Sequence, residues 1–166
     1  SEVDSNKAFY WYQEAAKKDD ARSNYMLAIM YASGFGATKD IEKSIQYHVK
    51  AAILGSTDSS YYLGNIYLKG ENIKQDLDKS IFWFEKGKEK EHIPSIFNLG
   101  QIYLSDNLSK KDEKKAFECF LLSARLDHRE SQKQVSYMYK EGIGVEKSDW
   151  KSEYWLKKYS TSSEIE

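Results

Sequence analysis

Apolar and polar positions along the chain follow the period of an amphipathic helix, and one such helical segment returns four times. It begins with Leu or Val and ends with Tyr four residues later. The copies are Leu27–Tyr31, Leu63–Tyr67, Leu99–Tyr103 and Val135–Tyr139, which recur every 36 residues without insertion or deletion. A fixed period of this size is typical of a stacked repeat protein, in which each unit buries its apolar face against its neighbours.

Each repeat is predicted to open with a helix whose small and apolar residues share one face. Positions within a repeat are counted from its first residue, which is Ala21, Thr57, Ile93 or Arg129. Position 3 holds Ser23, Ser59, Ser95 and Ser131, and position 8 holds Ala28, Gly64, Gly100 and Ser136. Small residues let a second helix approach closely, while Leu or Val at position 7 and Tyr at position 11 fill the remaining volume.

A glycine-rich turn is predicted to end this first helix. Position 14 holds Gly34, Gly70, Asp106 and Gly142, and position 16 holds Gly36, Asn72, Leu108 and Gly144. Glycine, followed by Asn and Asp, enters the left-handed conformation of a helix C-terminus with the smallest side-chain penalty. Leu108 does not fit this requirement, so we expect the third turn to have a different shape.

A second helix is predicted to begin after position 20, which holds Asp40, Asp76, Asp112 and Ser148. An Asp or Ser directly before an apolar helical pattern is an N-cap, whose side-chain oxygen accepts a backbone N–H of the first turn. Lysine follows at position 23, and we expect weak, exposed ion pairs between the two positions. The core-facing stripe lies at positions 24, 27, 28 and 31. Positions 27 and 28 are Tyr47 and His48, Trp83 and Phe84, Cys119 and Phe120, and Trp155 and Leu156.

Half of a repeat precedes the first complete one. Trp11 and Tyr12 align with positions 27 and 28, and Asp4 and Lys7 align with the capping Asp and its lysine. We therefore predict a single repeat domain over residues 1–166, made of a half repeat (4–20), four repeats (21–56, 57–92, 93–128 and 129–159) and a polar tail (160–166). The half repeat is either a terminal cap or the end of further repeats upstream.

The composition narrows the classes of partner. The 25 basic and 26 acidic residues leave a net charge of −1, which argues against the broad basic surface of a nucleic-acid-binding protein. No stretch approaches the roughly 18 apolar residues of a membrane span, so we expect no membrane insertion. The one cysteine forms no intramolecular disulfide, which favours a reducing compartment such as the cytoplasm. A start at Ser1 without Met leaves a periplasmic or secreted location open if a leader was removed.

The repeated residues resemble the Sel1-like repeat, a relative of the tetratricopeptide repeat. The resemblance rests on Leu-Gly-x-x-Tyr, Gly-x-Gly, Asp-x-x-Lys followed by Ala or Ser, and then an aromatic residue and Ala-Ala, over residues 4 to about 159. The third repeat departs most, through Asp106, Leu108 and Cys119. The resemblance implies an all-α, right-handed superhelical solenoid of helix pairs. It also implies an adaptor that assembles or regulates other proteins, or that bacteria use against hosts and competitors, with catalysis rare in the repeats.

We interpret the histidines and the paired glycines as structural residues and not as parts of a nucleotide or metal site. Gly34-Phe35-Gly36 follows a helix, whereas a dinucleotide fingerprint follows a strand. His48 stands at a core-facing position and is predicted to be a packed histidine with one hydrogen bond. His92 and His128 are predicted to lie at the surface or in loops, and no Cys or carboxylate recurs beside them at metal-ligand spacing. No metal or other cofactor is expected.

Cys119 stands where the other repeats carry Tyr or Trp, and we interpret it as a small buried residue. The alternative is an enzyme that uses Cys119 as a nucleophile with a histidine. No catalytic residue is predicted under the preferred reading.

The outward face of the first helices carries more aromatic and branched residues than a purely solvated face should. In a tetratricopeptide-like arrangement these side chains line the concave surface. The predicted partner-binding residues are Tyr25, Ile29, Tyr61, Asn65, Leu68, Phe97, Gln101, Leu104 and Tyr137. Two interpretations remain: the rings pack against the neighbouring first helix, or they form a partner-binding stripe.

The sequence therefore predicts a protein-interaction module, an adaptor or scaffold that binds another protein or peptide and no nucleic acid. A more specific alternative is a bacterial immunity or inhibitor protein that neutralises a toxin or an enzyme. The identity of the partner and the oligomeric state are left open.

Overall fold

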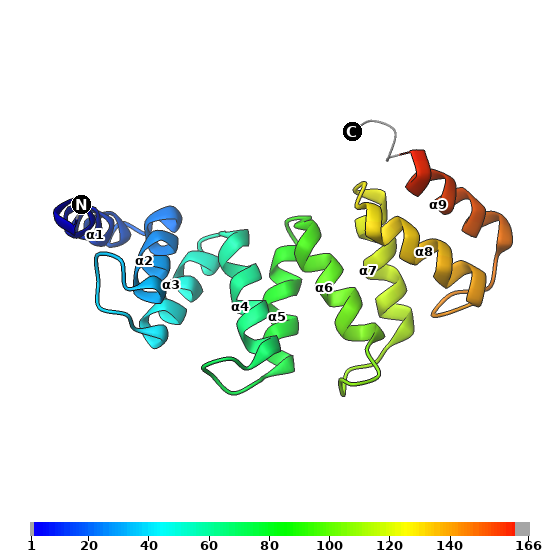
Figure 1. Cartoon of the computed structure of the whole chain (residues 1–166), viewed down its shortest axis with the longest axis horizontal. Coiled ribbons are helices and arrows are strands. Elements are labelled where there is room, and N and C mark those ends of the chain that lie inside the picture. The colour runs from blue at the N-terminus through cyan, green and yellow to red at the C-terminus, as the bar shows by residue number, and fades with distance from the viewer. Residues whose placement is uncertain (1, 162–166) are drawn as a thin grey trace. The chain divides into compact units, whose positions relative to one another are not determined.

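The computed structural model describes residues 2–161, with side chains from residue 4 onward, and within this range every regular element is a helix (Figure 1). The chain forms two compact units, with the boundary between residues 87 and 88. Unit 1 holds α1 (Glu2–Ala16), α2 (Ala21–Ser33), α3 (Ile41–Ile53), α4 (Thr57–Lys69) and α5 (Leu77–Lys88), whose last residue falls beyond the boundary. Unit 2 holds α6 (Ile93–Leu104), α7 (Glu113–Arg125), α8 (Arg129–Glu141) and α9 (Asp149–Thr161). Each predicted repeat forms one helix pair, so the all-α repeat fold is confirmed.

Small residues bring the two helices of a pair together. All four serines at position 3 and all four residues at position 8 are buried. A Cβ atom added at Gly100 would lie 2.8 Å from the ring of Phe120, and one added at Gly64 would overlap the ring of Phe84. Glycine therefore lets an aromatic ring of the second helix lie directly against the backbone of the first helix. The prediction that position 8 is a close helix crossing is confirmed.

The second glycine of the turn is needed for a close approach as well as for its backbone conformation. Gly36 has φ +75°, and a Cβ atom there would lie 2.7 Å from the carbonyl oxygen of Ser5 in α1. Gly144 has φ +66°, and a Cβ atom there would overlap the carbonyl oxygen of Glu113 in α7. Both turns thus pack on the first residues of the preceding second helix, where a side chain would push the two apart.

The third turn differs from the others, as its sequence predicts. Helix α6 ends at Leu104 and is followed by Ser105 in the extended conformation, with φ −72° and ψ 124°. In α2, α4 and α8 the corresponding cap is a left-handed glycine. Leu108 keeps a negative φ, because a branched side chain is strained in the left-handed region.

A backbone hydrogen bond that recurs in every repeat joins the end of each first helix to the residue before the second. The backbone N–H of position 20 donates to the carbonyl of the tyrosine at position 11 in all four repeats, at 2.7–3.0 Å. The capping aspartates accept the N–H of Lys43, Lys79 and Lys115 at 3.0, 3.0 and 3.1 Å, so these three N-caps are confirmed. The same lysines form the expected exposed ion pairs at 3.5–3.8 Å.

These lysines have a further contact that the sequence did not predict. In each repeat the ammonium group of position 23 lies over the ring of the tyrosine at position 11. The distances to the ring centre are 5.4 Å for Lys43 and Tyr31, 5.1 Å for Lys79 and Tyr67, 5.4 Å for Lys115 and Tyr103, and 5.3 Å for Lys151 and Tyr139. The tyrosine thus makes two contacts: its carbonyl oxygen accepts the N–H of position 20, and its ring holds the ammonium group of the lysine.

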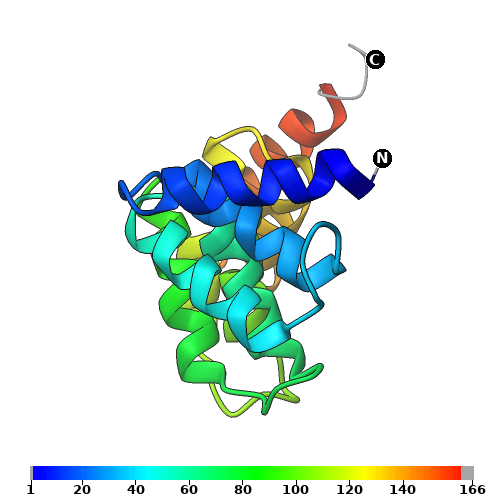
Figure 2. The ribbon, with the colours of Figure 1, turned by 90° about the vertical axis from the view of Figure 1, so that its left-hand side faces the viewer.

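Two aromatic or apolar positions of the predicted stripes are more exposed than their counterparts. Leu156 in α9 is 49% exposed, although Phe84 and Phe120 at the same position are fully buried. The prediction that Leu156 faces the core is wrong, because among the described residues no further first helix packs against this side of α9. Trp11 in α1 is 67% exposed. Helix α1 lies across α2 (Figure 2), and its Phe9 ring packs on the Tyr31 ring at 5.5 Å.

The predicted polar tail begins inside α9, which continues to Thr161. Residues 162–166 of that tail lie outside the described part of the chain.

We expect Gly100→Leu to lower the free energy of unfolding by about 1–3 kcal/mol, because its side chain would have to displace the Phe120 ring. The measurement is the urea midpoint, with far-UV circular dichroism to follow helix content. Gln101→Leu is the matched control, since it adds the same side chain at an exposed position of the same helix and should change stability by less than about 0.5 kcal/mol. Equal midpoints for the two variants would show that the crossing at Gly100 is not tight.

Candidate functional site

An open groove in unit 1 gathers residues from α2, α3, α4 and the turn after α4. Its volume is about 790 Å³. Four of the nine predicted partner-binding residues line it, namely Tyr25, Ile29, Tyr61 and Asn65. The groove is therefore the candidate functional site.

Helix caps fix where the two first helices that form its walls begin. Asp20 accepts the N–H of Ser23 at 2.7 Å at the beginning of α2, and Ser56 accepts the N–H of Ser59 at 3.2 Å at the beginning of α4. With these serines buried, positions 5 and 9 of the same helices face the groove. Local capping and the burial of small residues thus decide which side chains reach the site.

The rings at position 5 pack on the second helix of their own repeat. Tyr25 lies 5.8 Å from the His48 ring, Tyr61 lies 6.0 Å from the Phe84 ring, and the corresponding Phe97 in unit 2 lies 5.6 Å from the Phe120 ring. All three position-5 rings remain partly exposed. One side of each ring thus packs within its own repeat, while the ring remains partly exposed, and the partner-binding interpretation of these residues stays a prediction.

His48 forms the floor of the groove. Its side chain is 2% exposed, its Nδ1 lies 3.1 Å from the hydroxyl oxygen of Ser59, and its ring stacks on Tyr62 at 3.9 Å. Burial disfavours the charged imidazolium and lowers the pKa of His48 to about 4. The prediction of a packed histidine with a hydrogen bond is confirmed, and the floor of the groove is uncharged at neutral pH.

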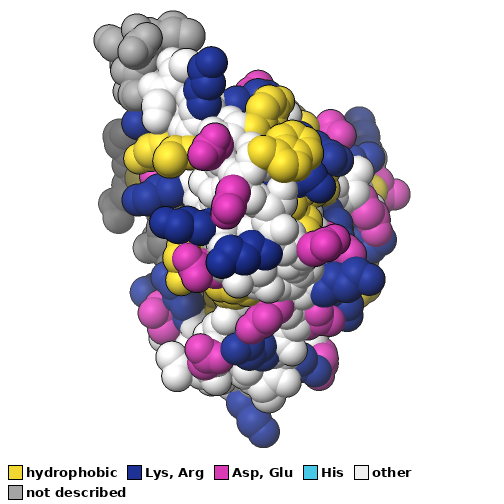
Figure 3. Space-filling model, turned by 90° about the vertical axis from the view of Figure 1, so that its right-hand side faces the viewer, with side chains coloured by type: hydrophobic (Ala, Val, Ile, Leu, Met, Phe, Trp, Pro, Cys, Tyr) yellow, Lys and Arg dark blue, Asp and Glu magenta, His cyan; other side chains and the backbone are white. Residues whose placement is uncertain are grey.

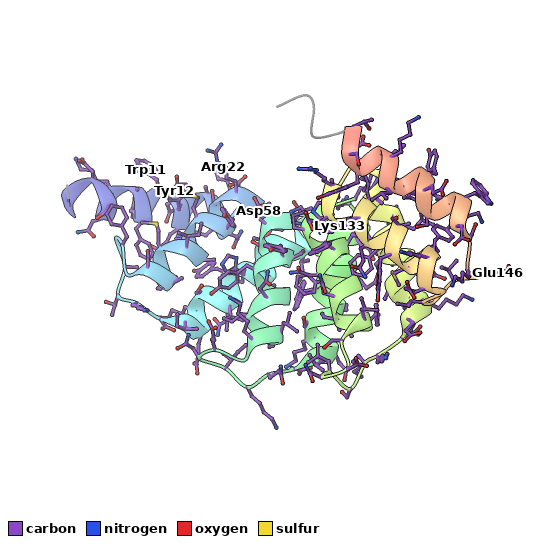
Figure 4. The ribbon with its side chains drawn as sticks, turned by 45° about the vertical axis from the view of Figure 1, so that its right-hand side comes forward. Trp11, Tyr12, Arg22, Asp58, Lys133 and Glu146 are labelled. Carbon is purple, nitrogen blue, oxygen red and sulfur yellow. The ribbon has the colours of Figure 1, made fainter. Side chains whose placement is uncertain are left out.

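The rim of the groove is polar and carries charges of both signs. Asp58 lies at the beginning of α4 (Figure 4), while Lys69 and Glu71 lie near its end, and all three are exposed. The side-chain amide of Asn65 donates to the carbonyl of Tyr61 at 3.0 Å, which orients it on the wall. Aromatic walls with a polar rim are typical of sites that bind polypeptide segments.

The other five predicted residues lie elsewhere. Leu68 is half-buried in α4 and is not part of the groove lining. In unit 2, Gln101 of α6 and Tyr137 of α8 are exposed, with Tyr137 52% exposed, while Phe97 and Leu104 of α6 are half-buried.

The groove also contains residues that sequence reasoning missed. Tyr62 stands at position 6, where the other repeats have Met, Asn and Gln, and this departure was the available signal.

The other histidines and the cysteine have structural roles. The Nδ1 atoms of His92 and His128 lie 2.8 Å from the hydroxyls of Ser95 and Ser131, at the beginnings of α6 and α8, so their predicted loop positions are confirmed. Burial lowers the pKa of His128. Cys119 is 2% exposed in α7, which confirms that it is buried.

Between residues 4 and 161, no three His, Cys, Asp or Glu side chains gather in a way that could hold a metal ion. None of the helices traced from residue 2 to residue 161 combines the length and the hydropathy of a membrane-spanning segment.

Buried small residues, capped helix pairs and an aromatic groove define an all-α repeat scaffold. The family model of the Sel1 repeat matches residues 1–20, 21–56, 57–92, 93–128 and 129–159. The chain therefore belongs to the Sel1 repeat family. Proteins of this family are generally protein-interaction modules. None of the curated proteins matches the sequence at a significant level.

Solved bacterial structures share the fold. A Sel1 repeat protein from Oxalobacter formigenes is 20% identical with a TM-score of 0.72, over 95% of this chain and 62% of that chain. A protective antigen of uropathogenic Escherichia coli, c5321, is 27% identical with a TM-score of 0.79, over 93% of this chain and 33% of that chain. The immunity protein Pa5087 from Pseudomonas aeruginosa is 15% identical with a TM-score of 0.55, over 92% and 72% of the two chains. The chain thus spans less than two thirds of the length of the first two proteins.

We expect the free energy of unfolding to fall by about 3 kcal/mol as the pH drops from about 6.5 to about 4, because His48 takes up a proton in the unfolded chain before it does so in the folded one. Above about pH 7.5, one unit above the unfolded-state pKa, both states hold mostly neutral His48 and this contribution is nearly constant. His48→Phe, which introduces the residue found at Phe84 and Phe120, should flatten this part of the profile. Urea midpoints across this pH range test the prediction, and an equally steep decline in the variant would contradict it.

We expect Cys119 in the folded chain to react with a thiol reagent at least about a hundredfold more slowly than in the urea-unfolded chain, because its sulfur lies in the core. Absorbance of the released thiolate measures both rates. Rapid reaction in the native state would favour the enzyme alternative that uses Cys119 as a nucleophile.

Proposed function

We propose that the chain binds a segment of a partner polypeptide in the groove of unit 1. The observation that supports this most directly is the trio of Tyr25, Tyr61 and Tyr62, which lines one groove while each ring remains partly exposed. Partly exposed aromatic rings are the usual anchors of interfaces, where a few residues supply most of the binding free energy. The general role of the family as protein-interaction modules supports the same class of partner.

The groove is ordered before any partner arrives. His48 holds Tyr25 at 5.8 Å and Tyr62 at 3.9 Å, and Phe84 supports Tyr61 at 6.0 Å. Rings that are already held by packing lose little conformational entropy when a partner covers them. This preorganisation favours binding, and the polar rim contributed by Asn65 and its neighbours supplies hydrogen-bonding groups for a peptide backbone.

The other predicted residues extend this proposal. Leu68 lies on the same helix as Tyr61, and Phe97, Gln101, Leu104 and Tyr137 form the corresponding outward positions of unit 2. We propose that the residues of this second set are the partner-contacting positions of unit 2. Their repeat positions match those of the groove residues, so the same side-chain directions apply within each unit.

Catalysis is a weaker candidate for this groove. His48 and Ser59 lie 3.1 Å apart, but Ser59 is fully buried and beyond the reach of a substrate. The lowered pKa of His48 also makes it a poor base at neutral pH. The pair is better explained as a satisfied hydrogen bond in the core.

Neutralisation of a toxin or an enzyme is a narrower form of the proposed function. The fold is shared with a protein named as an immunity protein, although 15% identity shows the fold alone. An inhibitor would use the same groove to cover a partner, so the two functions differ in the consequence for the partner. Activity assays on any captured partner would separate them.

We expect two variants of the groove to lose affinity for peptides that are selected on the wild-type chain from a displayed random library. Tyr61→Ala removes a ring, and Ile29→Asp places a charge on the apolar wall while leaving the ring packing intact. Each should weaken binding at least about tenfold, because truncation of an interface anchor costs about 2 kcal/mol or more. Fluorescence anisotropy with the synthesised peptides measures the affinities.

The matched control is Phe82→Ala in α5, which removes an aromatic residue that is 53% exposed and lies outside the groove lining. It should bind the selected peptides as the wild type does. Urea midpoints establish that the variants remain folded. Selected peptides that bind Ile29→Asp and the wild type equally well would refute the groove as the binding site.

A further inference from the structure

The second helix of the fourth repeat carries two exposed aromatic residues, at positions 22 and 26, whereas the second repeat has one, Phe82 at position 26, and the first and third repeats have none there. Trp150 stands at position 22, where the earlier repeats have Glu42, Asp78 and Lys114. It is 69% exposed, and Tyr154, one helical turn further along α9, is 49% exposed. An exposed tryptophan at a position that is charged in the other repeats is typical of an interaction surface.

These rings border a second groove, which lies within unit 2 among α7, α8 and α9 and has a volume of about 350 Å³. We call it the α7–α9 groove. Leu121 of α7 adds an apolar wall, and Trp155, which is 7% exposed, meets Tyr154 edge to face at 5.4 Å. Figure 3 shows hydrophobic side chains at the surface of one face, next to Lys and Arg side chains.

The α7–α9 groove is positively charged. Arg125, Lys151 and Lys158 line it, and none of its lining residues is acidic. The ammonium group of Lys151 lies 5.5 Å from the centre of the Trp150 ring, and that of Lys158 lies 5.7 Å from the Tyr154 ring. Cation–π contacts therefore hold the lysines beside the exposed rings.

An equivalent groove in unit 1 provides an internal comparison. It lies between α1 and α3, has a volume of about 270 Å³, and is lined by Lys17, Lys50 and Tyr47 at the positions of Arg125, Lys158 and Trp155. In that groove Lys17 is paired with Glu14 at 2.5 Å. The residue of α7 that corresponds to Glu14 is Leu122, so Arg125 has no carboxylate at this spacing. The α7–α9 groove is thus more apolar and more positive than its counterpart.

We infer that the α7–α9 groove is a second docking site, for an acidic polypeptide segment that also carries an apolar anchor residue. The anchor would lie against Trp150 and Leu121, and the carboxylates would pair with Arg125 and Lys151. A charged side chain that pairs at the edge of an apolar contact adds specificity and speeds association. Three cations on a chain of net charge −1 are few for a nucleic acid, which favours a polypeptide.

This site is independent of the groove in unit 1. The lining of the unit 1 groove includes the acidic Asp58 and Glu71 and the basic Lys69. An acidic segment is therefore disfavoured there and favoured in the α7–α9 groove. Failure of either proposal leaves the other standing, because different residues and different probes test them.

The test uses the full chain and a fluorescein-labelled octapeptide, Asp-Glu-Asp-Leu-Phe-Asp-Glu-Asp. Its charge-reversed partner, Lys-Arg-Lys-Leu-Phe-Lys-Arg-Lys, has the same apolar centre. Fluorescence anisotropy at low salt should show saturable binding of the acidic peptide and at least tenfold weaker binding of the basic one. The affinity for the acidic peptide should fall when the salt concentration rises to about 0.3 M, because ions screen the exposed cations.

Two variants locate the site. The double variant Trp150→Glu with Tyr154→Gln introduces the residues that α3 carries at these positions, Glu42 and Gln46, so the repeat itself shows that they fit a folded helix. It should bind the acidic peptide at least tenfold more weakly. Arg125→Gln, which removes one exposed cation and no ring, should weaken binding at least threefold. Tyr10→Gln is the matched control, because Tyr10 is 55% exposed in the equivalent α1–α3 groove, and it should bind within twofold of the wild type.

Several results would overturn the inference. They are the absence of saturable binding by the acidic peptide, equal binding of the two peptides, and unchanged binding by the double variant and by Arg125→Gln. Tighter binding of oligothymidylate than of the acidic peptide would assign the groove to nucleic acid instead. Dimerisation of the wild type in sedimentation equilibrium that is lost in the double variant would assign it to a second copy of the chain. If the double variant is unfolded by circular dichroism, the result with Arg125→Gln decides.

Discussion

An aromatic ring of the second helix lies against a glycine of the first helix in the second and third repeats. Phe84 meets Gly64 and Phe120 meets Gly100 so closely that a single added carbon atom would collide with the ring. This contact sets the distance between the paired helices and their rotation about their own axes. Once that rotation is set, positions 3, 7 and 8 face inward and positions 5 and 9 face outward, which places Tyr61 on a wall of the unit 1 groove.

The hydrogen bond and the lysine–tyrosine contact at the turn keep the two helices of a pair in register, although the turn itself varies. The third turn lacks the left-handed glycine cap, yet Asp112 still donates its N–H to the carbonyl of Tyr103 at 2.7 Å. Lys115 still lies over the Tyr103 ring at 5.4 Å. The path between the two ends of the turn can therefore change, provided that the tyrosine, the capping residue and the lysine keep their spacing.

The residues with functional promise are those that depart from the repeat. Rings that recur at positions 11 and 28 are used for packing, whereas Tyr62 and Trp150 occur once at their positions and lie on grooves. A regular scaffold needs only the recurring residues for stability, because each unit repeats the same contacts with its neighbours. Exposed aromatic residues that the scaffold does not need are typical of interaction surfaces, so Tyr62 adds to the position-5 rings in the first proposal and Trp150 supports the second.

The sequence by itself determined the helices, their caps and their buried faces. The period of 36 residues, the serines at position 3 and the capping aspartates are local signals, and the helices begin and end where these signals occur. It also placed four residues of the unit 1 groove on one outward face. The tertiary structure decided that Tyr61 packs on Phe84 of its own repeat, that the lysines lie over the tyrosine rings, and that Leu156 is exposed while Phe120 is buried. These outcomes depend on which helix lies next to a side chain, and helical period specifies the direction of a side chain but not the neighbour that it meets.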